Sequence, residues 1–141
     1  MTMIFSRTLS AATAAYAGYC FAEPAHLPQA LGWKADRTET GKRIAYALGI
    51  RDAAISSVGV FGDRHQVRRA MQARMFFDVF DAAVLAPQGA DRTAQLKVGG
   101  TALAYGVLNL AALTADSRRV RKASQLLTLT TPAGVARSVL R

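Results

Sequence analysis

Five ionisable residues lie inside otherwise apolar stretches of this sequence: Arg51, Asp52, Arg74, Asp78 and Asp81. A charge at bilayer depth or in a protein interior is costly unless it is paired or hydrated, so each of these residues needs a partner. Arg74 and Asp78 are four residues apart and Asp78 and Asp81 are three apart, which places all three on one face of a helix. We expect this face to point toward the other helices.

The preceding apolar segment offers a face that this stripe can contact. Asp52 lies there among small residues on one side of a helix, together with Gly49, Ser56 and Gly59. Small residues allow a second helix to approach closely. We therefore expect Asp52 to reach Arg74.

A polar ridge on the last apolar segment completes a candidate site. Thr101, Tyr105 and Asn109 repeat there at every fourth residue and have no reason to face lipid. The residues that we expect to carry any catalysis are Asp52, Arg74, Asp78, Asp81, Tyr105 and Asn109. Three Asp residues against two Arg residues leave one carboxylate in excess, and such a carboxylate is expected to hold a proton. A protonated Asp beside an ionised one can supply an acid and a base.

The same residues also fit a purely structural role, which is the leading interpretation. Arg74 can neutralise Asp52, Asp78 or Asp81, so that the network fixes the register of the helices. The Tyr and Asn side chains then fill the remaining donors and acceptors. The alternative is a small intramembrane enzyme that performs acid–base chemistry of the isomerase, cyclase or epoxide hydrolase type on a lipophilic substrate.

Other kinds of site find little support in the residues. Cys20 is the only cysteine, so the chain alone builds no disulfide and no Cys-based metal site. His26 and His65 are expected to be solvated loop residues and are too far apart to suggest a metal site. The Ser residues have no His at helical spacing, and the Gly-rich stretches lack the context of a phosphate loop. We expect no cofactor and no metal.

Four apolar segments must position these residues: 4–22, 44–62, 67–86 and 98–115. The last segment contains no charged residue and ends at Asp116. A helix of that length spans about 27 Å, close to the hydrocarbon thickness of a bilayer. The sequence thus predicts an all-α protein, a four-helix transmembrane bundle with short loops.

A soluble bundle is the alternative fold, because the mean hydropathy is only +0.14. Alanine contributes little to hydropathy, however, and the connecting loops hold much of the charge. Apolar residues make up 51% of the 141 residues and charged residues 19%, which argues against disorder. A helix on the surface of a soluble bundle has one polar face, whereas residues 98–115 carry no charge. The membrane interpretation is therefore favoured.

The distribution of basic residues predicts the orientation in the membrane. The net charge is +9. With a cytoplasmic N-terminus, ten Lys and Arg residues fall on the inside and six on the outside, when Arg51 and Arg74 are left out as intramembrane. We expect a multi-pass protein of the cell membrane with both termini in the cytoplasm, and Trp33 as an interfacial anchor.

The two ends of the chain each have two interpretations. The first apolar segment is either a membrane span or a signal that is cleaved after Ala22. Residues 1–116 are predicted to form the membrane domain, and residues 117–141 a basic tail. The tail either lies on an anionic lipid surface or only sets the topology through its charges.

The residues around Arg51 and Asp52, followed by Arg74, Asp78 and Asp81, resemble a pattern found in small four-helix membrane proteins of bacteria and fungi. That family is grouped only as a domain of unknown function. The resemblance covers about residues 5–115. It implies a four-span fold and the same buried Arg and Asp positions, and it brings no established reaction.

These features leave three classes of function. The leading class is a membrane scaffold or accessory subunit, with the lipid bilayer and a membrane protein as partners. The second is the enzyme described above, with a lipophilic small molecule as its partner. An ion-conducting bundle is disfavoured, because helices packed through Ala and Gly leave little lumen. Nucleic-acid binding is not expected, because the basic residues flank apolar segments rather than lining one face.

Overall fold

The computed structural model describes the backbone of residues 3–130 and the side chains of residues 3–126. The described chain is helical and contains no strand, as the sequence predicts. Its elements are α1 (Ile4–Ala22), α2 (His26–Ala30), α3 (Ala35–Phe61), α4 (Arg64–Leu85), the 3-10 helix η1 (Ala86–Gln88) and α5 (Arg92–Thr130).

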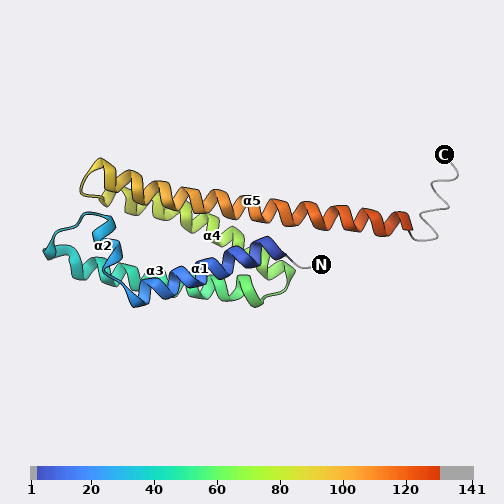
Figure 1. Cartoon of the computed structure of the whole chain (residues 1–141), viewed down its shortest axis with the longest axis horizontal. Helices are drawn as coiled ribbons and strands as arrows, with labels where there is room; N and C mark the ends of the chain where they lie inside the picture. Colours follow the sequence, from blue (N-terminus) through green and yellow to red (C-terminus); the bar gives the residue numbers. More distant parts are fainter. Residues whose placement is uncertain (1–2, 131–141) are drawn as a thin grey trace.

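The long helices pack in two pairs, α1 against α3 and α4 against α5 (Figure 1). The N-terminus and the turn between α3 and α4 lie at one end of the bundle, and α2 lies at the other. α5 extends well past the rest of the bundle at the N-terminal end. The chain therefore brings the start of α1 close to the middle of α5.

Local signals account for the two turns that flank α3. Gly32 has a φ of 66°, a left-handed conformation that glycine adopts without strain, and it follows α2 directly. At the other end, Asp63 and Gln66 form a reciprocal capping box at the start of α4. The Asp63 carboxylate accepts from the Gln66 backbone N–H at 2.9 Å, and the Gln66 side chain accepts from the Asp63 N–H at 2.7 Å.

Small and polar residues form the buried faces of the two N-terminal long helices. Those of α1 are Ser6, Ser10, Thr13, Ala17 and Cys20, and those of α3 are Gly41, Ala45, Gly49, Asp52, Ser56 and Gly59. Both sets recur every three or four residues, which is one helical face. The absence of large side chains there lets the two backbones approach closely.

Large apolar side chains point outward instead. Ile50 and Phe76 are each 64% exposed, Val107 is 66% exposed and Phe61 is 85% exposed. A soluble bundle buries such residues and exposes its charges. In this bundle these residues are exposed while Asp52, Arg74 and Asp78 are buried, beside a small apolar core that includes Leu31, Val67 and Met71.

Two helices are long and apolar enough to cross a membrane, α3 and the part of α5 from Arg92 to Leu126, and less than a third of each apolar stretch is buried. The all-α prediction is confirmed, and the four-span topology stays a prediction, because no other helix among residues 3–130 meets this criterion. The expected helix at 98–115 does not end at Asp116. It continues as α5 to Thr130, since residues 116–130 contain neither Gly nor Pro. The predicted tail thus begins inside a helix, and its residues 131–141 lie outside the described part.

Candidate functional site

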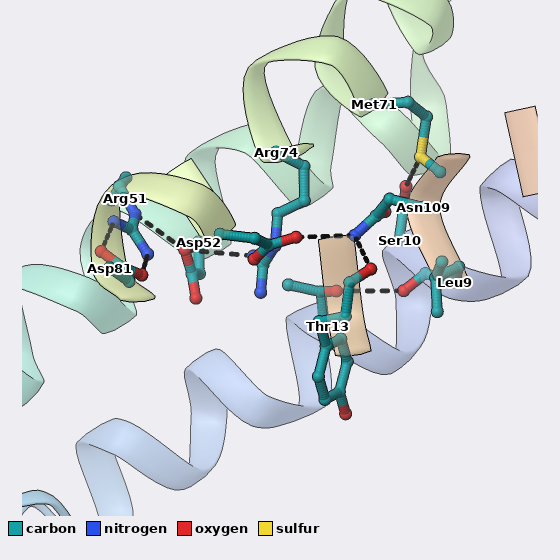
Figure 2. Close-up of polar contacts among 11 residues, drawn as sticks. Leu9, Ser10, Thr13, Arg51, Asp52, Met71, Arg74, Asp81 and Asn109 are labelled. Atoms are coloured by element: carbon teal, nitrogen blue, oxygen red, sulfur yellow. Dashed lines mark hydrogen bonds and ion pairs between the residues drawn. The ribbon is translucent and has the colours of Figure 1, made fainter. Parts of the chain in front are cut away.

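A chain of ion pairs connects α3 with α4 in the interior of the bundle (Figure 2). Arg51 donates from both terminal nitrogens to the two carboxylate oxygens of Asp81, at 2.8 and 2.7 Å. Its Nε donates to Asp52 Oδ1 at 2.9 Å. The paired geometry with Asp81 is the strong, planar arrangement that a guanidinium forms with a carboxylate.

Arg74 continues the chain on the other side of Asp52. Its Nη1 lies 3.1 Å from Asp52 Oδ1, and its Nε lies 3.2 Å from Asp78 Oδ1. Neither N–H is aligned for a hydrogen bond with these oxygens, so the contact is an ion pair by charge and distance. Since Asp52 is 1% exposed and Arg74 is 6% exposed, the attraction acts with little screening by solvent.

Asn109 brings α5 into the network. Its side-chain nitrogen donates to Asp78 Oδ2 at 3.0 Å and to the backbone oxygen of Tyr105 at 2.9 Å. Asn109 is buried beside Gly106, where a Cβ would lie 3.4 Å from the Cβ of Asp78. The small residue allows α4 to approach α5 at this level, so three helices share one polar network.

The structure brings together most of the residues that the sequence singled out. Asp52 reaches Arg74, as predicted, and Asp78 and Asn109 join the same network. Asp81 is linked to them through Arg51, which the candidate site had left out. The spacing from residue 51 to residue 81 gave no local signal for this pair, because the contact crosses between helices.

A cavity of about 250 Å³ lies beside the network. The ionisable side chains of Arg51, Asp52, Arg74, Asp78 and Asp81 line it, together with apolar residues that include Leu27, Leu85 and Val98. Tyr105 and Thr101 also border the cavity, so two of the three residues of the predicted ridge lie at its wall, whereas Asn109 does not line it. A cavity of this kind fits a small molecule with one polar and one apolar part.

A tyrosine and a histidine stand together at the same cavity, contrary to the expectation that His26 is a solvated loop residue. His26 is the first residue of α2, and its Nδ1 lies 2.6 Å from the backbone oxygen of Glu23. A carbonyl oxygen only accepts, so Nδ1 donates this bond, and in the neutral imidazole Nε2 then accepts from the Tyr16 hydroxyl at 3.2 Å. Sequence patterns had marked Tyr16 only as part of an apolar segment.

Comparisons with protein-family models, with curated proteins and with solved structures found no match. The resemblance to the four-helix family rests on the short Arg and Asp pattern alone. The function is therefore argued from the site and from the surface of the bundle.

Proposed function

We propose that this chain is a multi-pass membrane protein with four spans, and that its buried Arg/Asp network joins the spans as the core of a scaffold or accessory subunit. The observation that carries the proposal is the reversed distribution of side chains. At the level of the network, the ionisable residues Asp52, Arg74 and Asp78 and the small residues of α3 face inward, and large apolar side chains such as Ile50 and Phe76 face outward. In a bilayer both halves of this distribution are favourable.

The two faces of α4 support its proposed role as a membrane span despite its modest hydropathy. Its ionised residues in the bundle, Arg74 and Asp78, are buried. Its exposed face carries Phe76, Val79 and Phe80. The charged residues lower the average hydropathy of α4, but Arg74 and Asp78 are buried in the bundle, and the exposed Arg64, Arg68 and Arg69 lie in the first two turns, at the end of the proposed span. α1 has the same arrangement, with Ser and Thr inside and aromatic residues outside.

The topology is tested with reporters fused after Arg141 and inserted in the turn between α3 and α4. Both are expected to report the cytoplasm, because the basic residues at this end of the bundle outnumber those at the other. A reporter at either place that reports the opposite side of the membrane would overturn the proposed orientation. Loss of the protein from carbonate-washed membranes would overturn the membrane location itself.

α1 is proposed to remain in the mature protein as the first span. Its buried face packs along α3, and Cys20 near its C-terminal end lies close to Gly49. A Cβ added at Gly49 would lie 3.0 Å from the Cβ of Cys20. Removal of residues 1–22 would expose the polar and small face of α3. The mass of the purified protein checks this, since cleavage after Ala22 would remove the first span.

The cavity supports a second candidate function, that of an enzyme for a lipophilic substrate. Asp78 and Asp81 line the cavity together with Tyr105, and three carboxylates face two arginines in the network. One carboxylic acid could donate a proton to a substrate oxygen while a neighbouring carboxylate takes a proton from carbon or from water. Proton-shifting isomerisation, cyclisation and epoxide opening all use this pair of roles.

The Asn variants of Asp78 and Asp81 separate the two candidates. An amide keeps the shape of the side chain and removes its capacity for proton transfer. For a scaffold, at least one variant is tolerated, and any cellular phenotype follows the amount of folded protein. For an enzyme, one variant keeps its abundance and melting temperature while the phenotype of a deletion strain returns. Glu39→Gln, in the exposed pair with Lys42, is the matched control.

A further inference from the structure

An apolar groove of about 590 Å³ runs between α1 and α5, away from the Arg/Asp network. Its walls include Ile4, Phe5 and Leu9 of α1 and Leu108, Ala111 and Ala112 of α5. α1 packs along α3 far more extensively than along α5, which leaves this groove open at the surface. Residues 4–12 of α1 extend along about 12 Å of helix, close to the depth of one leaflet, about 15 Å.

A basic cluster stands where the groove ends. Arg118, Arg119, Arg121 and Lys122 follow on the same helix and surround a second hollow. The Arg119 guanidinium lies 4.4 Å from the centre of the Phe5 ring, and Phe5 is itself a wall of the groove. One cation is thus held at the mouth of the apolar groove.

The start of α4 adds positive charge on the neighbouring side. Arg64, His65 and Arg68 line a pocket together with Asp116 and Ser117 of α5. The Asp116 carboxylate already accepts from the backbone of α1. Residues 117–141 contain no Asp or Glu, and within the described side chains the four basic residues of the cluster form no salt bridge. The cluster therefore carries a net positive charge.

We infer that the groove and the basic cluster together bind one anionic phospholipid, with an acyl chain in the groove and the phosphate group at Arg118 and Arg119. The inference rests on the membrane location proposed above. An apolar groove that ends at a cluster of cations is complementary to a lipid that joins an acyl chain to a negative headgroup. A guanidinium donates paired hydrogen bonds to phosphate oxygens, and an anionic lipid lacks the choline cation that offsets this attraction in a zwitterionic lipid.

The test reconstitutes the full chain in nanodiscs that contain phosphatidylglycerol and phosphatidylcholine in equal amounts, with the same acyl chains. Gentle extraction and native mass spectrometry then give the ratio of the two lipids that remain bound. We expect phosphatidylglycerol to be retained preferentially. Each of Arg118→Gln and Arg119→Gln should lower the ratio about fivefold, as expected for one basic residue near an anionic surface.

Two further variants separate a built site from general attraction. Ala111→Trp fills the groove without changing the charge, and it should also reduce the amount of retained lipid. Arg43→Gln removes an exposed charge from the first half of α3 and should leave the ratio unchanged. Equal retention of the two lipids, or retention unaffected by Ala111→Trp, would overturn the lipid site. A chain that does not insert into the nanodisc bilayer would instead count against the proposed membrane location.

Discussion

The Asp116 carboxylate of α5 accepts a hydrogen bond from the backbone N–H of Ser6 at 2.8 Å, and its other oxygen accepts from Phe5 at 3.3 Å. α1 has no capping side chain of its own. A residue more than a hundred positions later in the sequence therefore supplies the cap. Asp116 is 1% exposed, and its negative charge also suits the positive end of the α1 dipole.

Asp116→Ala is expected to lower the free energy of unfolding by about 1–2 kcal/mol, because two buried N–H groups lose their acceptor. Denaturant titration of the purified protein in detergent measures this loss. Asp36→Ala, which removes an exposed carboxylate from the first turn of α3, is the control and should change stability by only a few tenths of that amount. Equal losses in the two variants would contradict the capping role.

Arg74→Ala is expected to cost about 3–5 kcal/mol, because Asp52 and Asp78 lose their shared cation while they remain buried. The loss should appear as a lower yield of folded protein in detergent. Lys42→Ala breaks the exposed pair with Glu39 and should cost at most about 0.5 kcal/mol. A folded Arg74→Ala protein with unchanged stability would show that the network does not hold α3 and α4 together.

Gly59→Ala tests the close contact between α1 and α3. A Cβ at this position would lie 2.7 Å from the Cβ of Ser10, so one of the helices must move. We expect a loss of thermal stability and partial recovery in the double variant with Ser10→Gly. Gly100→Ala is the control, since nothing lies within 4 Å of a Cβ there, and alanine favours the helix. Equal melting temperatures for the two single variants would contradict the packing of α1 on α3.

The capping box at the start of α4 gives a pH dependence. The hydrogen bond from the Gln66 backbone lowers the pKa of Asp63 below its ordinary value of 3.8. A lowered pKa means that the ionised cap adds stability above pH 3.8 and that this stability is lost as the pH falls through the lower, folded value. The advantage of the wild type over Asp63→Ala should therefore shrink on acidification from about pH 6 to about pH 3. An advantage that does not change with pH would contradict the role of the ionised carboxylate.

The sequence predicted the helical class and the inner faces of α3 and α4, because both follow from local periodicity. Asp78 lies four residues after Arg74, and a helix alone brings these two side chains together. Asp52 could be matched to Arg74 because both interrupt apolar segments and both need a partner. The expected role of these residues in catalysis stays a prediction.

Contacts that depend on the path of the chain could not be predicted from local patterns. The pair of Arg51 with Asp81 requires the relative rotation of α3 and α4, and the contact of His26 with Tyr16 requires the position of α2. The extension of α5 past Asp116 was missed for a different reason. Charged residues were taken as the end of a membrane segment, but they do not end a helix.

The continuity of α5 connects the buried network with the start of α1. Asn109 and Asp116 are seven residues apart on this helix, which is about two turns and places them on the same face. Arg119 follows on the same rigid rod, held over Phe5. Through Asn109 the helix contacts Asp78 of α4, and through Asp116 it caps the start of α1, so the same face of one helix fixes the positions of both neighbours.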